Sequence, residues 1–130
     1  LVEAGYVQDK REAFAKWLDV GNPGYVPRLH LTVPEAVQLL HGAGGLAVLA
    51  HPAQYHNDEL PAQLAPFGLD GLECRHPDQP VELQPRYLQM AARLGLAVTG
   101  GSDCHTEGLG AYTMNGEEMQ KLMQRWFRLK

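Results

Sequence analysis

The sequence predicts an α/β fold in which an open layer of three parallel strands is flanked by helices. Three short apolar runs, at 46–50, 71–74 and 96–99, have the composition of buried strands. Segments with helical spacing of apolar residues separate these runs, and the connections are short. Such alternation predicts parallel strands joined by right-handed crossovers. A possible fourth strand near Tyr112 extends the layer without closing it into a barrel.

The amino-terminal part is expected to form a subregion of its own. Residues 9–18 predict an amphipathic helix, because apolar side chains recur there at helical spacing: Ala13, Phe14, Trp17 and Leu18. The segment "VGNPGYVPR" then supplies glycine, asparagine and proline, which stop a helix and force an extended loop. We therefore place a boundary here, with residues 1–28 before it and 29–130 after it.

Helices are predicted between and after the strands, over 33–42, 57–65, 82–94 and 117–127. Thr32 and Glu35 fit a capping box at the start of the first. Its apolar residues are expected to form a buried face: Ala36, Val37, Leu39 and Leu40. Gly95 fits the stop signal of the third.

Composition and charge exclude several classes of protein. The chain has 130 residues, of which 45% are hydrophobic, and this suffices for one domain with a core. The formal net charge of −4 argues against a surface that holds duplex DNA by its phosphates. The apolar run 46–50 is too short to span a bilayer, and residues 1–20 are charged, so we expect no membrane or export role. Cys74 and Cys104 occur singly, which favours a reducing cytoplasm over a disulfide framework or a thiolate zinc site.

Polar side chains follow each predicted strand, at the edge where functional groups of parallel sheets collect. His51 follows the first strand, Glu73 and then His76 follow the second, and Asp103 and His105 follow the third. Residues two apart in extended chain point the same way, so Asp103 and His105 can address one ion or two neighbouring ions. Carboxylate oxygen with imidazole nitrogen suits zinc, manganese or iron. The sequence therefore predicts a candidate metal site.

Structural explanations compete with this interpretation. His51 could simply cap a strand end, and Asp103 could cap a helix beside a surface His105. His76 lies in the polar turn "RHPDQP", where we expect it to be exposed. The remaining histidines have no predicted role: His30, His41 and His56.

Three segments taken together, "GGLAVLAHP", "GLDGLECRHP" and "LGLAVTGGSDCH", resemble the polymerase and histidinol phosphatase (PHP) family. The likeness is to its small bacterial and archaeal metal-dependent phosphoesterases, including enzymes that act on nucleoside bisphosphates and on the 5′ ends of short RNA. It extends over nearly the whole chain, since "GLGAY" is similar to the family's final strand. The resemblance implies the C-terminal part of a distorted (β/α)7 barrel. Residues 1–28 would then end a helical insertion, or cap, and 29–130 would be the C-terminal portion of the barrel domain.

The resemblance also implies roles for individual residues. His51, Asp103 and His105 match metal ligands in a site for two or three divalent ions, manganese, zinc or iron, with Asp103 and His105 as the catalytic pair. Other side chains would support the ligands or face the substrate phosphate: Glu73, His76 and Arg28. The substrate would be a small phosphorylated molecule such as a nucleotide or short RNA.

The sequence departs from the family pattern in two ways. Cys104 stands where an aromatic residue is usual, and its apolar flank predicts a buried, inert thiol. The family's amino-terminal H-x-H motif and several further ligands do not occur in these 130 residues. We therefore expect little or no hydrolysis by this chain alone, and we expect it to need the missing half of the site or to self-associate.

Three hypotheses about function follow. The first is a hydrolytic metal-dependent phosphoesterase, represented here by part of its site. The second is a non-catalytic or degenerate PHP-like domain that binds a metal or ligand. The third is an α/β interaction module whose strand-end histidines only cap and solvate; a metal titration distinguishes it from the other two.

Overall fold

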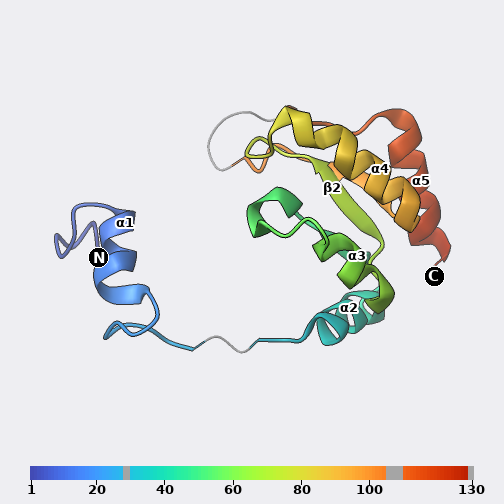
Figure 1. Ribbon diagram of the computed structural model, residues 1–130. Coiled ribbons are helices and arrows are strands. Elements are labelled where there is room, and N and C mark those ends of the chain that lie inside the picture. Colours follow the sequence, from blue (N-terminus) through green and yellow to red (C-terminus); the bar gives the residue numbers. More distant parts are fainter. Residues whose placement is uncertain (28–29, 105–109, 129–130) are drawn as a thin grey trace. The chain divides into compact units, whose positions relative to one another are not determined.

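The computed structural model describes the whole chain except residues 28–29, 105–109 and 129–130 (Figure 1). Two compact units are present, residues 1–30 and 31–130. The assignment of the first unit to a cap stays a prediction. In the part of the chain that the structure describes, no helix has both the length and the apolar character needed to cross a bilayer.

The first unit contains one short helix, as predicted over 9–18. Helix α1 spans Lys10–Ala13 and continues as a π-helical turn over Phe14–Leu18. The Asp9 carboxylate caps it by accepting the Glu12 backbone N–H at 2.8 Å. Ala13 is buried, whereas the other residues of the predicted apolar face are exposed: Phe14, Trp17 and Leu18.

The second unit is built on the predicted three-stranded parallel sheet. Strands β1 (Val48–Leu49), β2 (Gly71–Arg75) and β3 (Ala97–Gly100) lie in the order β1-β2-β3. Both neighbouring pairs are parallel, as expected for strands joined by helical crossovers. Strand β1 is shorter than the predicted run 46–50.

The predicted fourth strand near Tyr112 is wrong. Residues 110–115 form a turn, a bend and irregular chain before the last helix. Tyr112 has a left-handed backbone with φ of 58°, and a strand needs extended backbone at each residue.

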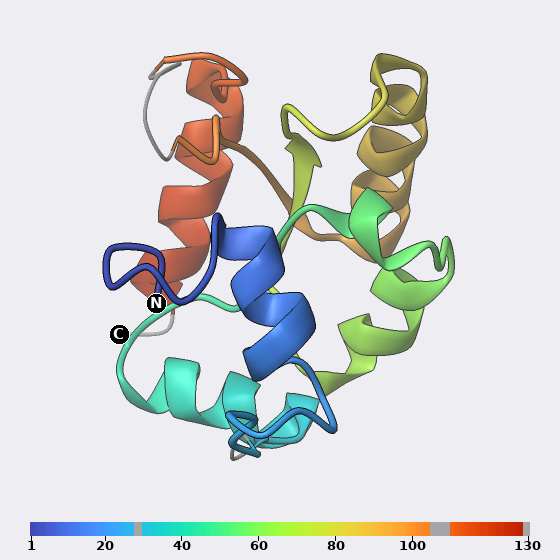
Figure 2. The ribbon, with the colours of Figure 1, turned by 90° about the vertical axis from the view of Figure 1, so that its left-hand side faces the viewer.

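The helices of this unit are α2 (Val33–Gly42), α3 (Leu60–Leu64), α4 (Gln84–Leu94) and α5 (Gly116–Arg128). Short 3-10 turns cover Pro52–Tyr55, Ala65–Phe67 and Val81–Leu83. Figure 2 shows α4 and α5 on either side of β2. One hydrophobic core joins the sheet to α2 and α4: Val37, Ala47, Leu69, Leu72, Cys74, Tyr87, Met90, Ala91 and Leu96.

The predicted buried face of α2 is mostly exposed. Thr32 and Glu35 form the expected capping box, with the Glu35 carboxylate accepting the Thr32 N–H at 2.8 Å. Only Val37 of the predicted face is buried, while Leu39 is 65% exposed and Leu40 45%. The reason is the position of α2, which lies beside the amino ends of the strands and not across a face of the sheet (Figure 2).

A polar cluster around Asp70 occupies the amino edge of the sheet. The Asp70 carboxylate accepts the Ala47 backbone N–H at 2.8 Å and lies 2.7 Å from His41 Nε2. Arg125 of α5 approaches the same carboxylate at 3.6 Å. His41, to which the sequence assigned no role, therefore ties α2 to the sheet, and this edge is structural. The carboxyl edge carries the predicted site.

Candidate functional site

The carboxyl ends of the three strands bring four of the predicted residues together. The Glu73 carboxylate accepts the His51 backbone N–H at 2.7 Å. The rings of His51 and His76 meet edge to face, with centroids 5.4 Å apart. His76 Nε2 in turn lies 3.4 Å from Asp103 Oδ2. A continuous chain of contacts thus runs from the end of β1 through β2 to the segment after β3. His105 and Arg28 lie outside the described residues.

Two of these residues have left-handed backbone conformations. His51 has φ of 33° and Asp103 has φ of 44°, in a region that costs a non-glycine residue about 1 to 2 kcal/mol. Such conformations persist where the surrounding structure enforces them, and they cluster at active sites and ligand clamps. The same left-handed backbone occurs at His56 and Tyr112, so the strain at His51 and Asp103 is compatible with a ligand role but does not assign one.

A β-bulge at the end of β2 lets the side chains of Glu73 and Arg75 reach different partners, His51 and Glu118. Glu73 pairs with Thr99 and Arg75 pairs with Gly100, so Cys74 is an extra residue without a partner on β3. Bulges re-aim side chains and are frequent next to active sites. Glu73 faces the candidate site, where one carboxylate oxygen lies 3.4 Å from the position of a Cβ on Gly101.

His76 is buried, with 2% of its surface exposed, so the prediction of an exposed side chain is wrong. The polar turn folds inward because its own groups bond back to β2. The Gln79 side chain donates to the Cys74 carbonyl at 2.7 Å, and the Gln79 N–H donates to the His76 carbonyl at 3.1 Å. The Asp78 N–H donates to His76 Nδ1 at 3.1 Å.

That last bond determines what His76 can do. A ring nitrogen that accepts a hydrogen bond carries no proton, so in the neutral ring the proton is on Nε2. Nε2 is buried and lies 3.4 Å from Asp103 Oδ2. His76 is therefore suited to donate toward the Asp103 carboxylate and unsuited to bind a cation through Nε2.

The donor chemistry at this edge fits a divalent cation, although the described residues do not complete a ligand set. Among the described residues, the buried His51 Nδ1 has no hydrogen-bond partner, which leaves this nitrogen available to bind a cation. His51 and Asp103 have His76 as a common neighbour, at 5.4 Å between ring centroids and 3.4 Å from Nε2 to Oδ2 respectively. Within the described ranges, no group of three His, Cys, Asp or Glu side chains is arranged to hold a metal.

The cysteines contribute no thiolate here. Cys74 is completely buried, and burial raises the pKa of its thiol to about 12. Cys104 is half-buried rather than buried as predicted, because it lies in irregular chain after β3 and not within the strand. Both cysteines are free.

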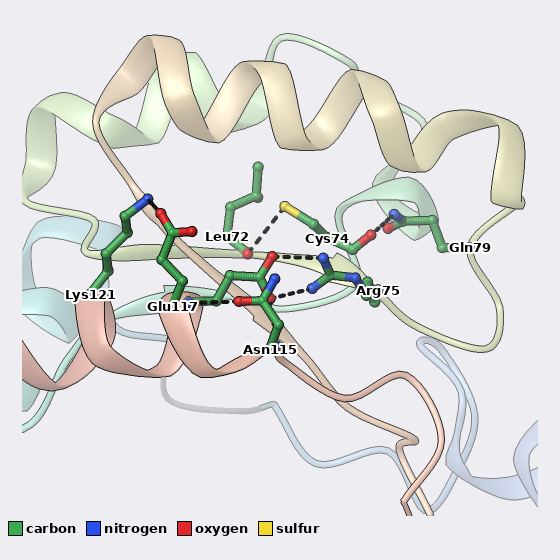
Figure 3. Close-up of polar contacts among 8 residues, drawn as sticks. Leu72, Cys74, Arg75, Gln79, Asn115, Glu117 and Lys121 are labelled. Carbon is green, nitrogen blue, oxygen red and sulfur yellow. Dashed lines mark hydrogen bonds and ion pairs between the residues drawn. The ribbon is translucent and has the colours of Figure 1, made fainter.

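An ion pair that the sequence did not reveal joins Arg75 at the end of β2 to α5 (Figure 3). Arg75 donates two hydrogen bonds of 2.7 Å to the two carboxylate oxygens of Glu118 on α5. The spacing of Asn115 and Glu118 fits a capping-box-like start of α5, but nothing in the sequence pairs Glu118 with Arg75.

Comparisons with known proteins identify phosphoester hydrolases as relatives. The chain is 35% identical over 115 residues to the 3′,5′-nucleoside bisphosphate phosphatase of Chromobacterium violaceum, covering 85% of this chain and 40% of that protein. It is 33% identical over 110 residues to the 5′-3′ exoribonuclease Rnm of Escherichia coli, covering 81% of this chain and 38% of that protein. No family model matches the chain.

A solved structure agrees with these relatives. A crystal structure described as a metal-dependent phosphoesterase from Bifidobacterium adolescentis superposes with a TM-score of 0.73 and 34% identity, covering 96% of this chain and 47% of that one. The chain is thus homologous to phosphoester hydrolases, consistent with its resemblance to the PHP family. It spans less than half the length of each of these relatives.

Proposed function

We propose that this chain is part of a PHP-type phosphoesterase and supplies the carboxyl-terminal portion of its metal site. The observation that carries the proposal is the convergence of His51, Glu73, His76 and Asp103 at one edge of the sheet. The names of the relatives, a bisphosphate phosphatase and an exoribonuclease, support phosphoester hydrolysis as the reaction.

In this proposal His51, Asp103 and His105 hold a divalent cation, manganese, zinc or iron. Divalent cations in such sites neutralise phosphate oxygens and lower the pKa of a water molecule. They would also supply the positive charge that a chain of net charge −4 lacks.

The other residues position these ligands. Glu73 accepts the backbone N–H of His51 and so fixes the end of β1 against β2. His76 Nε2 lies 3.4 Å from Asp103 Oδ2, and we infer that its N–H restricts the orientation of that carboxylate. Groups that hydrogen-bond to a metal ligand typically alter metal affinity by about 10- to 100-fold.

We propose a small phosphorylated substrate such as a nucleotide or a short RNA, by analogy with the two named relatives. Arg28 is proposed to contact the substrate phosphate, because a guanidinium can bind two phosphate oxygens at once. Binding of duplex DNA is not expected, since the acidic chain lacks the charge for it.

A metal titration with matched variants tests this function. We expect the 130-residue chain to bind Mn²⁺ weakly, and we expect His51→Ala and Asp103→Asn each to weaken binding by about tenfold or more, because each removes a ligand. Isothermal titration calorimetry measures the affinity. Hydrolysis of a nucleoside bisphosphate by this chain should stay close to background, since few ligands are present.

Two further variants serve as controls. His56 resembles His51 in its left-handed backbone and lies at the other end of the same 3-10 turn, so His56→Ala should leave Mn²⁺ affinity unchanged. Asp58, which pairs with Arg86 on the surface, provides the control Asp58→Asn. Equal effects of His51→Ala and His56→Ala, or rapid Mn²⁺-dependent hydrolysis by the chain that Asp103→Ala abolishes, would contradict the account.

A further inference from the structure

The loop that carries Asp103 leaves β3 at Gly100 and leads into α5 through residues 110–115. Its two ends are fastened beside the end of β2. The Gly101 N–H donates to the Arg75 carbonyl at 3.1 Å. On the return path, the Tyr112 carbonyl packs against Gly100 so closely that a Cβ there would lie 2.4 Å from it. Arg75 thus lies where the loop begins and ends.

The side chain of Arg75 connects this point to α5. Its Nη1 and Nη2 donate to Glu118 Oε2 and Oε1, each at 2.7 Å (Figure 3). The two side chains are only 19% and 13% exposed. A two-bond pair of this kind fixes orientation as well as distance, and burial shields it from screening by salt.

Glu118 also fixes the first turn of α5. Its carboxylate accepts the Asn115 backbone N–H at 2.9 Å, and Asn115 Oδ1 accepts the Glu118 N–H at 2.9 Å. This reciprocal arrangement is a capping box. One carboxylate therefore joins Asn115, where the loop ends, to Arg75 of β2, which lies opposite the point where the loop leaves β3.

The bulge in β2 makes this connection possible. Because Cys74 is an extra residue, Arg75 lies opposite Gly100 instead of one position further along β3. Glu73 can then face the candidate site while Arg75 reaches α5. Arg75 also keeps the pKa of the Glu118 carboxyl below its usual value, so the pair stays charged at neutral pH.

We propose that Arg75 and Glu118 are positioning residues that hold both ends of the Asp103 loop and thereby set the affinity of this edge for a divalent cation. This inference rests on the proposed function. Neither residue is placed in contact with the cation or the substrate. We call this pair the loop brace.

The competing explanation is an ion pair that contributes to stability alone. Buried ion pairs are weak evidence for stability, because desolvation of the charges offsets much of their attraction. The two explanations differ in where an effect appears. If the pair only adds stability, its loss lowers the protection of backbone amides from hydrogen exchange throughout the unit. If it acts as a brace, its loss lowers that protection at the Gly101 and Asn115 amides of the loop while the amides of β2 stay protected.

The test compares two double variants of the 130-residue chain. Arg75→Met with Glu118→Gln removes both charges of the loop brace and leaves no unpaired buried charge, and glutamine still fits the capping box. The matched control is Glu117→Gln with Lys121→Met. It removes a neighbouring, exposed ion pair of α5, in which Lys121 Nζ lies 2.7 Å from Glu117 Oε1. The readouts are backbone amide hydrogen exchange and Mn²⁺ affinity.

We expect the brace variant to exchange about tenfold faster at the Gly101 and Asn115 amides, which donate hydrogen bonds at the two ends of the loop, with residues 71–73 of β2 unchanged. We also expect it to bind Mn²⁺ about tenfold more weakly. The control should match the wild type in both readouts. If the brace variant does not fold, Arg75→Lys keeps the charge, gives up one of the two bonds and should show the same pattern at smaller size.

The possible failures are distinguishable. Loop exchange and Mn²⁺ affinity that stay at wild-type values in the brace variant would overturn the inference. Exchange that rises evenly over the loop and β2 would also overturn it and leave a stability role. Faster exchange confined to the loop, in a chain whose wild type binds no Mn²⁺, would support the brace and count against the proposed function.

Discussion

His76 shows how a single hydrogen bond can define a residue's role. Its burial and its position between His51 and Asp103 would suit a metal ligand. The bond from the Asp78 N–H to Nδ1 occupies one lone pair, so a neutral ring has a proton on Nε2. We propose that the ring then orients the Asp103 carboxylate, with cation binding left to His51, Asp103 and His105.

The tautomer of His76 is the first prediction at this scale. We expect neutral His76 to be protonated at Nε2 and unprotonated at Nδ1, because Nδ1 accepts the Asp78 N–H. Long-range ¹H–¹⁵N correlation spectra of a histidine-labelled sample, recorded above pH 8, distinguish the two nitrogens. His56, an exposed histidine with no hydrogen bond to either ring nitrogen among those described, is the reference in the same spectrum. A proton found on Nδ1 of His76 would show that the assigned role is incorrect.

At the scale of elements, the junction of β2 with α5 determines where the candidate ligands lie. The bulge at Cys74 turns Glu73 toward the site and Arg75 toward α5. Glu118 receives the bonds of Arg75 while capping the helix. A strand irregularity and a helix start thus cooperate to hold the loop between β3 and α5.

This junction predicts a pH-dependent stability. The pKa of the Glu118 carboxyl is lowered from its usual value, mainly by the hydrogen bonds from Arg75. A lowered folded-state pKa gives a stabilisation that is present above the unfolded-state pKa and is lost as the pH falls through the folded-state value. The free energy of unfolding of wild type should therefore exceed that of Glu118→Gln at pH 6, and the difference should shrink below about pH 4.

Urea denaturation at a series of pH values measures this difference. Glu117→Gln is the control, since that carboxylate is 74% exposed and its removal should change stability by less than about 0.5 kcal/mol at any pH. A difference between wild type and Glu118→Gln that is the same at pH 6 and pH 3.5 would count against the loop brace as an ion pair.

At the scale of the whole molecule, most elements could be predicted from local signals. Residues close together in the sequence carry these signals: the capping box at Thr32, the helix stop at Gly95 and the apolar runs before His51 and Asp103. The structure confirms the predicted helices and the parallel sheet. The exposure of Leu39 and Leu40 could not be predicted, because periodicity shows which face is apolar and not whether another element covers it.

The site was predictable only as a set of candidates. Strand ends and ligand chemistry pointed to His51, Glu73 and Asp103. The burial of His76 depends on bonds from Gln79 back to Cys74, and the loop brace joins residues 43 positions apart. Such contacts follow from tertiary packing, and a polar turn such as "RHPDQP" carries no local sign of them.

We propose that His51, Asp103 and His105 bind one cation at the carboxyl edge of the sheet. Anomalous X-ray diffraction at the zinc edge, on crystals of the chain grown with Zn²⁺, locates such an ion. We expect a zinc peak within about 2.0 to 2.2 Å of an imidazole nitrogen of His51 and a carboxylate oxygen of Asp103, with His105 as a further ligand. Zinc peaks only at other residues, or side chains of His51 and Asp103 that share no peak, would contradict it.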